Sequence, residues 1–239
     1  MNLPYSLIDG DFVEIYNVRN FTYQSETDYQ PLYETRRYDL RKLDSVWFVV
    51  ERFGDLPGIA HTFLSFGFGD DYVSVSVEVR KEKGETYSVL MGLLREYEIM
   101  YVIGDERDLI GLRTNVRRDQ VYLYPIVTTR DRIRQTFLDI LKRTKRLHQT
   151  PEFYNTVTNT CTTNIVRHVN TISPQRVPYD PRILLPAYSD KLAYELGLID
   201  TSLPFEQTQA AHRIDLIAQQ HSLDRNFSKA IRAGRSPGG

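Results

Sequence analysis

The chain has a single cysteine, so no disulfide can form within it. It has no run of eighteen apolar residues, which excludes a transmembrane helix from this sequence. Residues 1–5 lack the basic start and apolar stretch of a signal peptide. The net charge of -1 provides no basic excess for binding phosphates, so we expect no nucleic-acid partner. These absences leave a globular protein whose one thiol is either a small buried hydrophobe or a reactive group.

What the sequence does contain predicts an α+β protein. The clearest strand is 72–80, where four valines alternate with polar residues. It should form a hairpin with 59–68, across a Gly-Asp-Asp turn. Further strands are expected at 11–18, 33–40, 44–53, 98–104, 109–113 and 120–127, with 44–53 the most apolar. Helices are expected at 89–97, 131–147, 161–169, 189–196 and 205–220.

Domain organisation follows from where the strands end. We expect residues 1–175 to form one domain in which an antiparallel sheet packs on a helix that carries the cysteine. Residues 176–239 have helical patterns only and should form a C-terminal extension packed on that domain.

Cys161 stands where a helix should begin. It follows Thr158, Asn159 and Thr160, which are residue types that cap helices, and apolar helical spacing starts at Ile165. The N–H groups and the dipole of a first helical turn favour thiolate over thiol. The position therefore favours a nucleophile over a structural cysteine.

A thiol nucleophile needs a base, and His61 is the best placed of the five histidines. It lies within a predicted strand, which is a rigid mount, although a core histidine is the alternative interpretation. His168 is two helical turns from Cys161, too far along the axis to share its proton. The remaining histidines, on other predicted helices, are His148, His212 and His221.

A third group should orient the imidazole. On the neighbouring strand, Glu78 could make a charge-assisted hydrogen bond to His61, and Ser76 a neutral one. The alternative is that both simply face solvent. One cysteine and scattered histidines offer no ligand spacing for a metal, so we expect neither a metal nor a cofactor.

At these residues the sequence resembles a known family, the Lnb N-terminal periplasmic domain family. The most specific match is the Asn-x-Cys-Thr-Thr-Asn run at 159–164. The other matching segments are 59–68, 79–85, 97–102, 105–108, 112–115, 151–155, 184–186, 188–190 and 193–197.

The resemblance implies a circularly permuted papain-like (NlpC-type) fold, with the histidine strand before the cysteine helix. Cys161 would be the acyl acceptor and His61 its base. Asn164 and Glu78 match family motifs that do not fix their roles, and Glu78 is expected as a third catalytic residue from its place on the neighbouring strand. Candidate substrate-binding residues are Ser76, Asn159, Thr162 and Asn164.

The resemblance also implies a function: acyl transfer or hydrolysis on lipid or lipoprotein acyl groups in the bacterial cell envelope. The protein would work in the periplasm or at the extracytoplasmic face of the membrane, with contact to the membrane surface. The alternatives are a cell-wall peptidase or amidase with the same Cys–His pair, and a non-catalytic binding domain with a vestigial site. A long apolar groove ending at Cys161 would favour the lipid substrate, and a short polar cleft the peptide.

Overall fold

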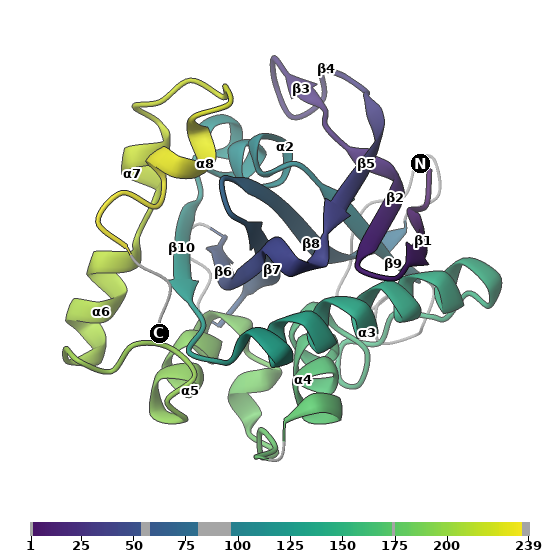
Figure 1. The fold of residues 1–239 in the computed structure, drawn as a ribbon. Helices are drawn as coiled ribbons and strands as arrows, with labels where there is room; N and C mark the ends of the chain where they lie inside the picture. Colours follow the sequence, from purple (N-terminus) through teal and green to yellow (C-terminus); the bar gives the residue numbers. More distant parts are fainter. Residues whose placement is uncertain (1, 54–57, 81–96, 174, 236–239) are drawn as a thin grey trace.

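The computed structural model describes residues 2–53, 58–80, 97–173 and 175–235, and it is an α+β protein (Figure 1). The strands are β1 (Tyr5–Asp9), β2 (Phe12–Arg19), β3 (Thr22–Tyr23), β4 (Tyr29–Gln30), β5 (Tyr33–Asp39), β6 (Leu43–Arg52), β7 (Ala60–Phe68), β8 (Asp71–Arg80), β9 (Glu98–Gly104) and β10 (Gln120–Pro125). The α-helices are α2 (Glu106–Gly111), α3 (Arg130–Gln149), α4 (Cys161–Ile172), α5 (Ser189–Glu195), α6 (Phe205–His212), α7 (Asp215–Ala218) and α8 (Phe227–Ala230). Shorter helical turns are η1 (Leu40–Lys42), η2 (Leu112–Arg117), η3 (Pro181–Ile183) and η4 (Pro186–Tyr188).

One large sheet organises the described residues. Its strand order is β1-β2-β9-β8-β7-β6-β10, with β5 paired to β2. Neighbours run antiparallel except for β2 and β9, which meet in parallel. The predicted hairpin of 59–68 with 72–80 is confirmed as β7 and β8, at the centre of this sheet. The sheet is therefore mixed but mostly antiparallel.

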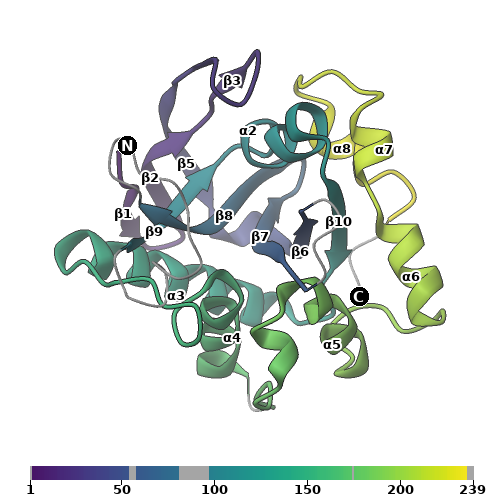
Figure 2. The ribbon, with the colours of Figure 1, turned by 180° about the vertical axis from the view of Figure 1, so that it is seen from behind.

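Helices cover both faces of the sheet, as Figures 1 and 2 show from opposite sides. On one face, α3 and α4 pack on even-numbered residues of β7 such as Leu64 and Phe66. On the other face, α2, α7 and α8 pack on odd-numbered residues such as Phe63. Burial on both sides explains why Ser74 and Ser76 are fully buried, where the alternation of β8 suggested a solvated face.

The strongest sequence patterns are confirmed. The apolar stripe predicted on the helix 131–147 is buried throughout α3, and the apolar run 46–50 is buried in β6. The α3 stripe consists of Ile133, Phe137, Ile140, Leu141 and Leu147.

Two predictions were wrong. Residues 109–113 are not a strand, because Asp105 caps α2 by accepting a hydrogen bond from the Arg107 N–H, and η2 then continues as a π-helical turn. Residues 205–220 are not one helix, because the chain becomes extended at Arg213 and makes a β-bridge to Tyr122. The predicted helix 89–97 lies almost entirely outside the described residues.

The C-terminal segment contributes to the core rather than only covering it. From α7, α8 and the residues beside them, Ile214, Ala218, Phe227 and Ile231 are all buried with the second face of the sheet. Arg232 makes a buried two-point ion pair with Glu106 at the start of α2. These contacts fasten residues 205–235 to the sheet.

Candidate active site

Cys161 is the first residue of α4, as predicted. Thr160 caps the helix, and a reciprocal pair of hydrogen bonds with Thr163 completes a capping box. In the first turn of an α-helix, the N–H groups of Cys161 and Thr162 have no intrahelical acceptor. The thiol is thus held beside free N–H groups at the positive end of a helix.

Strands β7 and β8 separate at one end, and this separation lets the thiol of Cys161 reach the sheet. β7 and β8 pair only as far as Phe63 and Ser76, whereas β7 remains paired with β6 down to Ala60, and β8 remains paired with β9 up to Arg80. The helix start lies against this gap, where Thr62 hydrogen-bonds Thr162 at 3.0 Å.

His61 meets Cys161 across the gap. Burial alone raises the pKa of the thiol, but a hydrogen bond to His61, the charge of that imidazole and the bonds from Thr62 bring the pKa down to about 7. Burial likewise lowers the pKa of His61, but the charge of Glu78 and hydrogen bonds to Glu78 and Cys161 raise it to about 10. The two shifts favour a thiolate–imidazolium pair.

Ser76 and Glu78 support the far side of the ring. Nε2 of His61 lies 2.6 Å from Oγ of Ser76 and 3.3 Å from Oε1 of Glu78. Ser76 donates to the same Glu78 oxygen at 2.7 Å. Because Nε2 is engaged there, Nδ1 is the ring nitrogen left for the sulfur of Cys161. The side chains that the sequence analysis singled out on β7 and β8 therefore lie together.

A buried arginine fixes the charge of Glu78. Arg113, from η2, donates to Glu78 at 3.0 Å and to Glu51 of β6 at 2.6 Å, and its guanidinium covers the ring of Phe63. Burial raises the pKa of the Glu78 carboxyl, but His61 above all, together with Arg113 and Ser76, holds that pKa well below its usual range. The imidazolium thus faces a carboxylate and not a carboxylic acid. Arg113 was not among the predicted site residues, because residues 109–113 were expected to form a strand.

The other candidate substrate-binding residues are occupied within the protein. Thr162 bonds Thr62, as described, and Asn159 donates to the carbonyl of Phe153 at 2.9 Å. Asn164 is buried and donates to Oδ1 of Asn159 at 2.9 Å and to the carbonyl of Thr160 at 2.8 Å. Asn159 and Asn164 therefore brace the turn that presents Cys161.

Another histidine, His168, is buried next to the turn that Asn159 and Asn164 stabilise. The sequence prediction considered only its distance from Cys161 and therefore missed its contacts. Nδ1 of His168 lies 2.7 Å from Asp139 on α3, and Nε2 lies 2.7 Å from the hydroxyl of Tyr101 on β9. The same hydroxyl is 3.3 Å from Oδ1 of Asn164. Asp139, His168, Tyr101 and Asn164, named here the α4 relay, connect the helix layer to the base of the cysteine turn.

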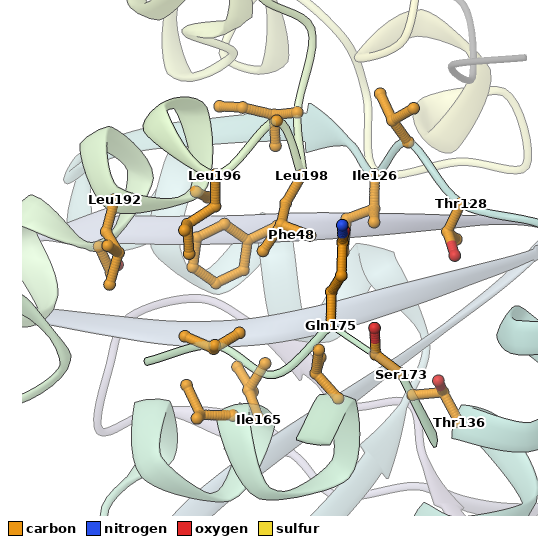
Figure 3. Close-up of a pocket in the computed structure, with 18 of the residues that line it drawn as sticks. Phe48, Ile126, Thr128, Thr136, Ile165, Ser173, Gln175, Leu192, Leu196 and Leu198 are labelled. Carbon is orange, nitrogen blue, oxygen red and sulfur yellow. The ribbon is translucent and has the colours of Figure 1, made fainter. Parts of the chain in front are cut away.

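A cavity of about 570 Å³ lies next to the site, between α4, the sheet and α5 (Figure 3). Thr162, whose hydroxyl is 3.8 Å from the sulfur of Cys161, lines one part of it. Most of the lining is apolar, and it includes Phe48, Ile165 and Leu196. Cys161 and His61 do not line this cavity, so Thr162 is the residue that connects it with the site.

In the parts of the chain that the structure describes, no three His, Cys, Asp or Glu side chains are placed to hold one metal ion. The same parts contain no helix long and apolar enough to cross a membrane.

Comparison with known proteins identifies the family. No curated protein and no solved structure matches the chain. A family model described as the Lnb N-terminal periplasmic domain matches residues 29–187, a range that includes His61, Glu78 and Cys161 and ends at η4. The expected periplasmic or extracytoplasmic location agrees with this match. The chain belongs to the Lnb N-terminal periplasmic domain family.

Proposed function

We propose that this protein is a thiol-dependent acyltransferase or hydrolase that acts on lipid or lipoprotein acyl groups in the bacterial cell envelope. The observation that carries the proposal is the pairing of Cys161 with His61, which lowers the pKa of the thiol to about 7. A buried structural cysteine has no need of such a partner. The order of a histidine strand before a cysteine helix further supports a circularly permuted papain-like (NlpC-type) arrangement.

The first half of the reaction would transfer the acyl group to sulfur. The thiolate of Cys161 attacks the carbonyl carbon of an ester, a C–S bond forms, and the carbonyl electron pair moves to oxygen. The N–H groups of Cys161 and Thr162 are suitable donors for this oxyanion. When the C–O bond breaks, the imidazolium of His61 gives its proton to the departing alkoxide, and a thioester remains.

The second half would return the enzyme to its starting state. His61, now neutral, takes a proton from an incoming amine or water as that nucleophile attacks the thioester. The C–S bond breaks and the electron pair returns to sulfur as thiolate. An amine gives acyl transfer and water gives hydrolysis. Glu78 and Ser76 keep the ring in position throughout, and Glu78 stabilises its charged form.

The surroundings of the thiol support a lipid substrate over a peptide. The cavity beside Thr162 is mostly apolar, which suits an acyl chain. In the loop that leads to α4, Phe153 and Val157 are exposed apolar side chains, well suited to contact with a membrane surface.

The test is to incubate the protein with a diacyl lipopeptide and, separately, with muropeptides, and to follow products and the protein mass by mass spectrometry. We expect acyl release from the lipopeptide and a protein adduct of one acyl group on Cys161. Cys161→Ala should abolish both, and His61→Ala should reduce turnover by about 10²–10⁴-fold. Thr171→Ala, on the exposed side of α4, is the matched control and should remain active.

Two results would overturn the proposal. Acyl release that persists in Cys161→Ala would remove the thiol from the reaction. Cleavage of muropeptides without any action on the lipopeptide would reassign the site to a cell-wall peptidase or amidase.

A further inference from the structure

A second carboxylate lies beside His61, and the reaction proposed for this site does not use it. Glu51 of β6 is directly opposite His61 of β7 in the antiparallel ladder, and it is fully buried. Residues directly opposite each other in such a ladder project from the same face of the sheet, with Cβ atoms about 4.5–5.5 Å apart. Glu51 therefore places a negative charge next to the imidazole. A charge buried this deeply needs a cation held against it.

Arg113 is that cation, and it is held between two carboxylates. Its Nε donates to Glu51 at 2.6 Å, and its two other nitrogens donate to Glu78 at 3.0 Å and to the carbonyl of Leu109 at 2.6 Å. All three nitrogens are thus engaged, and the shorter of the two ion-pair contacts goes to Glu51. One guanidinium charge cannot balance two carboxylates, so a negative charge remains for the imidazolium of His61.

Without Glu51 this balance would change. Burial lowers the pKa of His61, and the charge of Glu78 is the largest influence that raises it. If Arg113 had only Glu78 to pair with, it would neutralise that charge. The imidazole would then hold its proton less tightly. Glu51 thus supports the charged form of His61 in two ways, by occupying Arg113 and by its own charge on the neighbouring strand.

We propose that Glu51 is a positioning residue of the active site, which holds Arg113 so that the carboxylate of Glu78 stays available to the imidazolium of His61. Glu51 acts through Arg113 and through its charge, and not by contact with a substrate. Its part in turnover rests on the proposed function, in which the imidazolium gives its proton to the departing alkoxide. Its effect on the imidazole does not depend on that function.

The other charges that face Glu51 are held less firmly than Arg113. Arg117, also from η2, has Nη1 3.4 Å from Glu51, and its Nε is 3.4 Å from Glu26 in the turn between β3 and β4. The Arg117 side chain is 33 % exposed, compared with 4 % for Arg113. From β10, the residue opposite Glu51 is the apolar Val121. Arg113 is therefore the cation on which Glu51 mainly depends.

Glu51 also acts on a second titratable group, Asp119. The backbone N–H of Asp119 donates to the carbonyl of Arg113 at 3.0 Å, which places Asp119 beside the same cluster. Burial first, and then the charge of Glu51 and a hydrogen bond with it, raise the pKa of the Asp119 carboxyl to about 6. Asp119 is thus ionised at neutral pH and adds to the negative charge around Arg113.

The test follows the ring of His61 by NMR titration of histidine-labelled protein, with His61→Ala to assign its signal. In the wild type the ring should titrate near pH 10. Glu51→Gln removes the charge and keeps the size of the side chain. It should lower the midpoint to about 9 or below, since a charge of opposite sign within about 6 Å changes a pKa by about 1–3. Glu51→Asp keeps the charge and should titrate close to the wild type. Glu34→Gln, which breaks an ion pair with Arg36 on β5, is the matched control and should leave the midpoint unchanged.

Arg117→Gln makes the opposite change and covers the case that Glu51→Gln does not fold. It removes a partly exposed cation next to Glu51, so the protein should tolerate it. The His61 midpoint should then rise, by roughly 0.3 or more. Alkylation of Cys161 at neutral pH should change less than about twofold in the Glu51 and Arg117 variants, because the imidazolium is still charged at that pH.

The outcomes separate this inference from the proposed function. A His61 midpoint in Glu51→Gln that equals the wild-type value, or a midpoint in Arg117→Gln that does not rise, would overturn the role of Glu51. Acyl release that persists in Cys161→Ala would instead reject the proposed reaction and leave the titrations as they are. If the reaction holds, the alkaline limb of its pH–rate profile should move down with the His61 midpoint in Glu51→Gln, and a limb that stays in place would overturn the positioning role.

Discussion

Two buried histidines differ sharply, although each lies beside a carboxylate. His61 faces Glu78 and the thiol of Cys161, and its pKa is raised to about 10. His168 faces Asp139, yet its pKa is lowered, because burial outweighs the hydrogen bond that His168 donates to Asp139 and because Arg143 and Arg167 add positive charge. The first histidine is held as a cation and the second as a neutral ring.

The difference lies in how each carboxylate is surrounded. Glu78 belongs to a cluster in which the buried Arg113 pairs with both Glu78 and Glu51. The arginine stabilises the ionised carboxylate of Glu78, so a negative charge remains beside His61. The α4 relay instead connects Asp139 through His168 to the hydroxyl of Tyr101. Burial raises the pKa of Tyr101 above its ordinary value, so its hydroxyl stays protonated. The charged cluster around His61 is suited to proton transfer. The α4 relay, in which His168 is neutral, is suited to holding the cysteine turn in place.

The largest expected effect concerns the charged cluster. Arg113→Met would leave Glu51 and Glu78 without their shared cation, and should lower the free energy of unfolding by about 3–5 kcal/mol. Tyr101→Phe in the α4 relay should cost only about 1–2 kcal/mol, since it leaves one neutral acceptor unpaired. Urea unfolding of both variants measures the contrast. Equal losses would remove the distinction between cluster and relay.

The next effect concerns the thiol. In His61→Ala the pKa of Cys161 should return from about 7 to about 8.5 or above, since burial is then opposed only by the hydrogen bonds from Thr62. Alkylation by iodoacetamide at neutral pH should slow roughly tenfold. His148→Ala, at an exposed histidine near the end of α3, is the matched control and should leave both the pKa and the rate unchanged. A similar slowing in both variants would mean that His61 has no special role.

The pH dependence of stability should separate the two regions further. His168 has a lowered pKa in the folded state, so its protonation should remove stability as the pH falls below about 6.5. Glu78 also has a lowered pKa, and its contribution is present above about pH 4.3 and is lost as the pH falls through the folded value. Urea unfolding across pH should show that His168→Gln reduces the first loss, to which His212 with its lowered pKa also contributes, and that Glu78→Gln reduces the second. A single step that neither variant alters would contradict both assignments.

The smallest expected effect concerns Ser76, whose hydroxyl bridges the ring of His61 and the carboxylate of Glu78. Ser76→Ala leaves the direct contact of 3.3 Å between His61 and Glu78 in place. We expect a loss of stability of about 1 kcal/mol or less. The pKa of Cys161, followed by the ultraviolet absorbance of the thiolate, should rise only slightly. A rise as large as that in His61→Ala would show that the hydroxyl, and not the carboxylate, controls the ring.

Local patterns predicted much of the fold. Alternating valines placed β8, the apolar stripe placed α3, and the cap residues before Cys161 placed the start of α4. The error at 109–113 arose because three apolar residues and a glycine were weighed without Asp105, although an aspartate at that position is a helix-start signal.

What the sequence could not provide is contact between distant segments. Asp139, His168 and Tyr101 come from three separate elements, and no periodicity relates a tyrosine on a strand to a histidine on a later helix. The burial of Ser76 was equally hidden, because alternation within one strand says nothing about a second layer of helices. The cavity beside α4 also needs α5 in position, and that placement depends on the packing of segments far apart in the sequence.

The parting of β7 from β8 has one more consequence. Cys161 belongs to the helical layer, while His61 projects from the sheet with Phe63 on the side that packs against α2 and Arg113. The pKa of the Cys161 thiol therefore depends on how the helical layer is positioned against the sheet. Any ligand, partner or mutation that shifts α4 by a fraction of an ångström should register as a changed thiol titration, long before the protein unfolds.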